Sequence, residues 1–197
     1  MATEKKYKLT DECITIGNRQ LYRIEALKDF GDAHKGDKGG FIESEKNLSH
    51  NGDCWVFGNA AVWGNAAVWG NAAVGGSAEV YGDASVGGDA AVGGNARVYG
   101  NAEVFGNARV YGDARVGGSA DVYGTAKVVN NADYIVFKNW WSSGRYFTWT
   151  RSNNMWRVGC FYGTGEELIA KAYKDSELSG REYESVVKYV ESILKED

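Results

Sequence analysis

The sequence predicts a mainly β protein built around a parallel β-helix, and three observations support this. Valine recurs at every sixth residue from Val56 to Val128 without a slip. A small residue stands two positions before each valine, first Cys54 and then an alanine as far as Ala126. Each repeat closes with glycine, most often followed by asparagine or aspartate. An α-helix has a period of 3.6, so a strict period of six instead indicates a chain that turns a corner every six residues, with three corners to a coil of eighteen.

Residues 1–50 are predicted to form a β cap on the first coil. Polar and apolar residues alternate over Cys13–Ile16 and Leu21–Leu27, on either side of a turn at Gly17-Asn18, which is typical of a β-hairpin. Residues 29–40 are rich in glycine and aspartate and are expected to be a loop. An end coil exposes core side chains and strand edges, so a solenoid needs such a cap.

Residues 51–133 are predicted to be the repeat itself. On short strands the valine points inward and its two neighbours point outward. Glycine with asparagine or aspartate is expected to make the corners, since these residues tolerate positive φ. Residues eighteen apart then stack on one wall. The outward position after each valine gives Phe57, Gly75, Gly93 and Tyr111 on the first wall, Trp63, Tyr81, Tyr99 and Gly117 on the second, and Trp69, Gly87, Phe105 and Tyr123 on the third.

Residues 134–197 are predicted to form a small α+β domain. Strands are expected at Tyr134–Phe137, Tyr146–Thr150 and Met155–Val158. Two amphipathic helices should follow, each opened by a capping box, at Thr164–Glu167 and at Ser179–Glu182.

The stretch KYKLTDECITIG…LYRIEALKDFG…GDKGGFIESEKNLSHNGDCWVFGNA, followed by GNAxV repeats, resembles a group of hexapeptide-repeat proteins. These are encoded by phages, prophages and enteric chromosomes and are often labelled acyltransferases. The resemblance covers roughly residues 6–133 and implies a left-handed coil and a homotrimer. Phage proteins of this kind often end in a module with a GCFYGT phrase, which stands here at Gly159–Thr164.

The charges on two walls suggest how copies could assemble. Arg97 and Arg115 lie on the second wall, and Glu103 and Asp121 lie on the third wall at similar depth. We expect these walls to meet across a three-fold axis, with charges setting the register and aromatic side chains as anchors, namely Trp63, Tyr81, Tyr99 and Phe105. In the alternative interpretation the aromatics only stack within one chain.

The chain offers little for catalysis. Hexapeptide acyltransferases commonly use a histidine base near a subunit boundary, but His34 falls in a polar loop and His50 falls in an inward slot of the first hexad, where a packed role is expected. No Ser-His-Asp set, metal cluster or phosphate-binding loop is visible, so no metal or cofactor is expected.

Composition narrows the class of protein further. The net charge of −4 argues against a generic nucleic-acid binder. Cys13, Cys54 and Cys160 are odd in number and far apart, which argues against a disulfide framework. No apolar run approaches a membrane span. The protein is expected in a reducing cytoplasm, that of the host cell if a phage encodes it.

The strongest binding signal lies in residues 134–163, which carry four cations, Lys138, Arg145, Arg151 and Arg157, and no acid. A turn there could hold phosphate with hydroxyls, backbone N–H groups and a guanidinium while indoles stack on a base. The candidate ligand-binding residues are Trp140, Trp141, Ser142, Ser143, Arg145, Tyr146 and Arg151. Alternatively these aromatics form the core of the small domain, with the arginines on its rim.

These patterns together favour a non-enzymatic, trimeric, phage-type binding protein. Its expected role is counter-defence, by sequestering a host nucleotide signal or by blocking a host protein. The alternatives are an acyltransferase that uses acyl-CoA, and a structural spacer or virion component.

Overall fold

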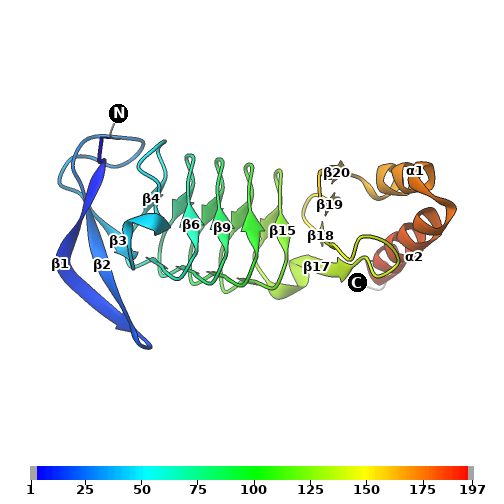
Figure 1. Cartoon of the computed structure of the whole chain (residues 1–197), viewed down its shortest axis with the longest axis horizontal. Coiled ribbons are helices and arrows are strands. Elements are labelled where there is room, and N and C mark those ends of the chain that lie inside the picture. Colours follow the sequence, from blue (N-terminus) through cyan, green and yellow to red (C-terminus); the bar gives the residue numbers. More distant parts are fainter. Residues whose placement is uncertain (1–3, 195–197) are drawn as a thin grey trace.

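The computed structural model describes residues 4–194, and its parts follow one another along a single line (Figure 1). A β-hairpin stands at one end, the stacked coils occupy the middle, and a four-stranded sheet with two helices forms the other end. The structure thus contains a parallel β-solenoid of about five turns. None of the described helices has the length and apolar character needed to cross a membrane.

The coils form three walls of parallel two-residue strands, as the eighteen-residue period predicts. The first wall contains β4 (Trp55–Val56), β7 (Ala73–Val74), β10 (Ala91–Val92), β13 (Arg109–Val110) and β16 (Lys127–Val128). The second contains β5 (Ala61–Val62), β8 (Glu79–Val80), β11 (Arg97–Val98) and β14 (Arg115–Val116). The third contains β6 (Ala67–Val68), β9 (Ser85–Val86), β12 (Glu103–Val104) and β15 (Asp121–Val122).

Valine and alanine side chains fill the interior of the solenoid, and each of them is at most 2% exposed. The corners depend on glycine alone. Every corner glycine has positive φ, from 60° at Gly58 to 77° at Gly82, whereas the only non-glycine residue with positive φ in the described chain is Asn154. The prediction that asparagine and aspartate share this conformation is therefore wrong. They form side-chain ladders instead, such as Asn65 Nδ2 donating to Asp83 Oδ1 at 2.9 Å.

The N-terminal cap is more regular than predicted. The hairpin β1 (Tyr7–Ile16) and β2 (Arg19–Ala26) turns at Gly17 as expected. Residues 38–40, predicted as loop, belong to β3 (Lys38–Ile42), which pairs with β2 and, in parallel, with β5 of the second wall. The hairpin therefore continues the second wall into one seven-stranded sheet.

The first coil is two residues longer than the later ones. Leu48, which follows the short helix η1 (Glu45–Asn47), is fully buried and bridges Val68, twenty residues ahead. Leu48, which the hexad places in the slot of the small residue, thus takes the valine slot predicted for His50, and His50 stacks on Tyr7 with ring centroids 4.2 Å apart. The hexad does not extend back to His50 as predicted.

Backbone polarity determines the chemistry of the two ends. Each coil donates its N–H groups to carbonyls of the next coil, as in Ala61 N to Ala78 O. Carbonyls are therefore left over at the N-terminal end and N–H groups at the C-terminal end. At the N-terminal end the cap supplies donors: Lys6 Nζ to Gly52 O and Cys54 O, and Asn47 Nδ2 to Gly64 O and Ala66 O.

The C-terminal module supplies acceptors for the last coil. Side-chain oxygens accept from four backbone N–H groups: Asn131 from Arg115, Tyr134 from Gly117, Thr148 from Asp121 and Ser152 from Lys127. The side chain of Asp133, at the end of η2 (Asn131–Asp133), also accepts from Val129 N. The module therefore caps the solenoid as well as following it in the chain.

The module has one strand more than predicted. β17 (Tyr134–Lys138), β18 (Tyr146–Thr150), β19 (Met155–Val158) and β20 (Phe161–Gly163) form an antiparallel sheet in that order. One face of this sheet packs Phe147, Trp149 and Trp156 against α1 (Gly165–Asp175) and α2 (Glu177–Leu194).

Of the two predicted capping boxes, only the first forms. Thr164 Oγ1 accepts from Glu167 N, and the Glu167 carboxylate accepts from Thr164 N. α2 begins earlier than predicted, because Ser176 Oγ accepts from Ser179 N and starts the helix at Glu177. Ser179 therefore lies inside α2.

Candidate functional site

The candidate site is the turn of residues 139–146, which connects β17 and β18. Asn139 is buried and fastens it with three hydrogen bonds. Its N–H donates to Arg145 O at 2.8 Å, its Oδ1 accepts from Ser142 N, and its Nδ2 donates to Tyr183 OH on α2. Gly144 has φ of +68°, so the turn can reverse there without strain. The turn is therefore tied to the core of the module.

Exposed aromatic and cationic side chains surround this turn. Trp140 is 73% exposed and Tyr146 is 48% exposed. Lys138 Nζ lies over the Tyr146 ring, 5.8 Å from its centroid. The Arg145 side chain is exposed and forms no ion pair within residues 4–194. A hydrogen-bonded turn and the strand ends beside it thus present an indole, a phenol and two cations to solvent.

The other predicted ligand-binding residues are placed differently. Trp141 is half-buried and packs against the module core, with its ring centroid 4.9 Å from that of Tyr183, and its buried Nε1 has no hydrogen-bond partner among residues 4–194. Ser142 and Ser143 are exposed on the turn, and Ser143 Oγ accepts from Arg145 N at 3.4 Å. The core interpretation therefore holds for Trp141, while Trp140 stays outside the core.

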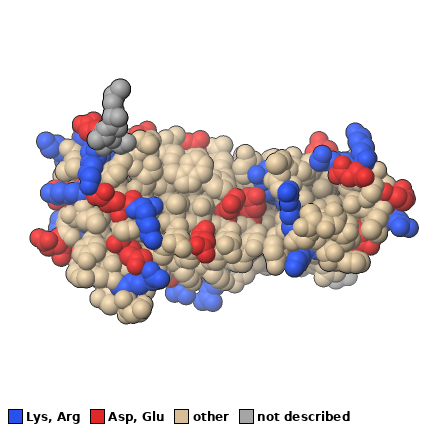
Figure 2. All heavy atoms as spheres, viewed as in Figure 1, with Lys and Arg blue, Asp and Glu red and all other residues tan. Residues whose placement is uncertain are grey.

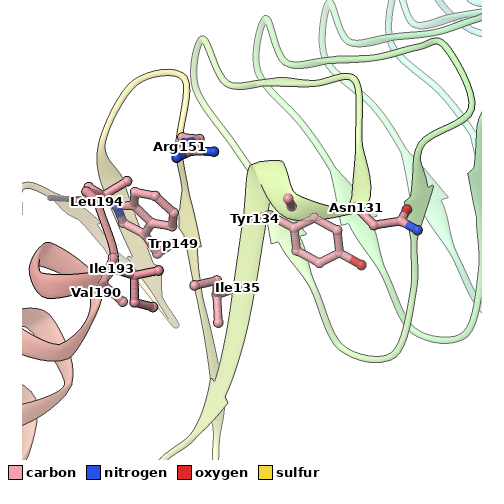
Figure 3. Close-up of a pocket in the computed structure, with 9 residues that line it drawn as sticks. Asn131, Tyr134, Ile135, Trp149, Arg151, Val190, Ile193 and Leu194 are labelled. Atoms are coloured by element: carbon pink, nitrogen blue, oxygen red, sulfur yellow. The ribbon is translucent and has the colours of Figure 1, made fainter. Parts of the chain in front are cut away.

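Arg151 lies away from the turn, directly after β18, and lines a cavity of about 290 Å³ between the last coil and α2 (Figure 3). Ile135, Trp149, Val190, Ile193 and Leu194 make most of this cavity apolar, and Asn131 and Tyr134 lie at its solenoid side. Arg151 therefore does not share a site with Arg145.

The turn faces the third wall of the solenoid. Arg145, Tyr146 and Gly159 line one side of a cleft of about 340 Å³, and Asn101, Glu103, Ser119 and Asp121 line the other. Sequence reasoning missed this juxtaposition, because only the packing of the module on the last coil brings these residues together. The cleft thus offers a cation and a phenol on one side and carboxylates on the other.

Both carboxyl groups of the cleft are shifted toward the protonated form. Glu103 and Asp121 are neighbours in register on adjacent strands. Burial, and then the charge of Asp121, raise the pKa of Glu103. Burial also raises the pKa of Asp121, although Arg157 Nε donates to its Oδ2 at 2.8 Å and offsets part of the rise. Asp121 Oδ1 is buried and has no hydrogen-bond partner in the part of the chain that the structure describes, so this side of the cleft has spare acceptor capacity for a donor.

Most of the predicted interface residues have partners within their own chain. Arg97 pairs with Glu79 at 2.8 Å, and Asp121 pairs with Arg157. Trp63, Tyr81 and Tyr99 form a continuous stack, with successive centroids 4.7 and 5.5 Å apart, and Phe105 leans on Trp69. Arg115 and Glu103 form no ion pair in the described chain. Stacking within one chain thus accounts for the second-wall aromatics without a partner copy.

Neither histidine lies on a wall of the coils. His34 is an exposed loop residue beside Asp37, and burial against Tyr7 lowers the pKa of His50. Cys13 and Cys160 are exposed, whereas Cys54 is buried. Between residues 4 and 194, no three metal-ligating side chains gather into a group.

Charged side chains are concentrated toward the two ends of the molecule, with fewer on the visible face of the coils (Figure 2). Comparison with known protein families and with curated proteins finds no match to this chain. The site's own geometry therefore carries the functional argument.

Proposed function

We propose that this protein is a non-enzymatic binding protein that captures a small anionic ligand with an aromatic ring, such as a nucleotide, at the turn of residues 139–146. In this proposal the solenoid is a left-handed β-helix of the hexapeptide-repeat, phage type and assembles as a trimer. Its role is counter-defence, by sequestering a host nucleotide signal or by blocking a host protein.

The observation that carries the proposal is the exposure of Trp140 on a fastened turn. An indole in water forgoes the stabilisation that burial gives to aromatic side chains. Here the backbone is held by Asn139, the same turn carries the exposed Arg145, and Lys138 and Tyr146 lie where the turn joins its two strands. A ligand that stacks its ring on Trp140 and places its phosphate near Arg145 would use both features at little ordering cost.

The locations of the two histidines support a non-catalytic role. His34 is solvated and His50 is packed in the cap, so neither lies on the coil walls where a hexapeptide acyltransferase would need its base. Incubation with acyl-CoA and a panel of amines and sugars should release no free thiol above the uncatalysed rate.

The binding proposal is tested with a nucleotide panel and isothermal titration calorimetry, supported by thermal shift. A bound nucleotide should raise the melting temperature by mass action. Trp140→Ala and Arg145→Ala should each weaken binding about tenfold or more. Arg181→Ala and Tyr189→Ala, which remove an exposed cation and an exposed aromatic from α2, should leave it unchanged. If no nucleotide binds, or if the α2 variants weaken binding as much as the turn variants do, the proposal is wrong.

A further inference from the structure

Glycine in the outward column of two walls lies beneath aromatic rings of the same chain. On the third wall, an added Cβ at Gly87 would collide with the rings of Trp69 and Phe105. On the second wall, an added Cβ at Gly117 would collide with the Tyr99 ring. In this molecule an outward glycine therefore provides the space in which an aromatic ring lies.

The first wall has two such glycines with no ring over them. An added Cβ at Gly93 would meet nothing within 4 Å, and one at Gly75 would meet only the Phe57 side chain at 3.6 Å. Phe57 and Tyr111 stand at the two ends, three coils apart, which is about 14 Å at the strand spacing of a sheet. With Ala73 and Ala91, these residues line a groove of about 440 Å³.

The same wall carries uncompensated positive charge at one end of the groove. Arg109 and Lys127 are direct neighbours in register on β13 and β16, and both are exposed. Like charges placed side by side on a sheet are destabilising. Neither side chain forms an ion pair within the part of the chain that the structure describes. The surface that complements this wall is therefore aromatic opposite the glycines and acidic opposite Arg109.

We infer that the occupant of the groove is the third wall of a second copy of this chain. Trp69 is 44% exposed and leans with Phe105 over Gly87, with their centroids 5.3 Å apart, so the two rings form a ridge. Glu103 lies on β12, two residues before Phe105 and at the same height on the wall, and it forms no ion pair among residues 4–194.

The two walls match in height when the coil axes are parallel. Trp69 precedes Gly75 by six residues, and Glu103 precedes Arg109 by six. Six residues are a third of a coil, or about 1.6 Å along the axis. Trp69 therefore lies level with Gly75, the point above Gly87 where the two rings meet lies level with Gly93, and Glu103 lies level with Arg109. The contact joins two different walls and is therefore heterologous, so its repetition about an axis parallel to the coils closes a ring only where the rotation between copies divides a full turn.

This inference rests on the proposed function, which includes self-assembly of the chain. It assigns the first wall, instead of the second, as the surface that contacts the third wall of a neighbouring copy. The test is sedimentation equilibrium with native mass spectrometry. Gly93→Trp places the chain's own indole in the groove without needing positive φ. It should weaken assembly about tenfold or more. Ser77→Trp, at an exposed corner off the groove, should leave assembly unchanged.

Charge exchange provides the second arm of the test. Arg109→Glu and Glu103→Arg should each weaken assembly, and the double variant should restore it. Circular dichroism checks that each variant keeps its fold. A monomeric wild type overturns both the proposed assembly and this contact. If the wild type assembles and Gly93→Trp has the same mass in solution, the proposed contact is wrong but the assembly stands. The same holds if the double variant fails to restore assembly. Nucleotide titration of the wild type tests the ligand site separately.

Discussion

The polarity of the two caps predicts opposite effects for one chemical change, asparagine to aspartate. At the N-terminal end, the buried Asn47 amide donates to Gly64 O at 3.1 Å and to Ala66 O at 2.8 Å. Aspartate has no donor there, and each orphaned buried carbonyl costs about 1–3 kcal/mol, so Asn47→Asp should cost about 2–6 kcal/mol. A buried, unpaired carboxylate adds to this cost.

At the C-terminal end, Asn131 uses its oxygen, which accepts from Arg115 N at 2.8 Å. Aspartate keeps that acceptor, so Asn131→Asp should change stability by about 0.5 kcal/mol or less. Urea denaturation at pH 7 compares the midpoints of both variants with wild type. The deficit of Asn47→Asp should also shrink at lower pH, where a protonated carboxyl regains one donor. Equal losses for the two variants, or a larger loss for Asn131→Asp, would refute the polarity argument.

Three further predictions concern single side chains. Lys6→Met removes the buried ammonium that donates to the carbonyls of Gly52 and Cys54 in the first coil. We expect it to lower the free energy of unfolding by about 2–4 kcal/mol in urea denaturation. The exposed Lys5→Met is the control, and a similar loss in both variants would contradict the role of Lys6. Gly94→Ala forces a side chain into positive φ and should cost about 1–3 kcal/mol, while Gly93→Ala, in open space, should be nearly neutral by the same assay. Burial lowers the pKa of His50, so its contribution to stability is present above the unfolded pKa of about 6.5 and is lost as pH falls through the folded value. His50→Gln should therefore flatten the melting temperature against pH just below 6.5, and an unchanged slope would exclude this role.

The repeat could be predicted from sequence because the same environment recurs in every coil. Each Val and Ala occupies an equivalent inward position, so the period alone assigns the core and sorts the walls. The pairing of Arg97 with Glu79 was also accessible, since the two residues are eighteen apart.

The ends could not be predicted in this way, because each cap side chain has surroundings of its own. The first coil has twenty residues, so extending the hexad assigned His50 to a slot that Leu48 fills. The contacts of Thr148 and Arg157 with Asp121 join residues without any shared period. Trp140 and Trp141 are adjacent, and only the packing of Trp141 against Tyr183 and Phe147 distinguishes the half-buried indole from the exposed one.

Because every internal coil meets its neighbours in the same way, the distance between the two caps can change without altering either of them. Duplicating one eighteen-residue coil would lengthen the rod by about 4.8 Å and leave the end module facing the same direction. Duplicating a single hexad before residue 101 would instead rotate the module and its cleft together by one wall relative to the N-terminal cap. The number of hexads in the solenoid therefore sets both the distance between the two caps and their relative orientation. Gene duplication of whole coils could lengthen the rod in steps of one coil while keeping the cleft intact.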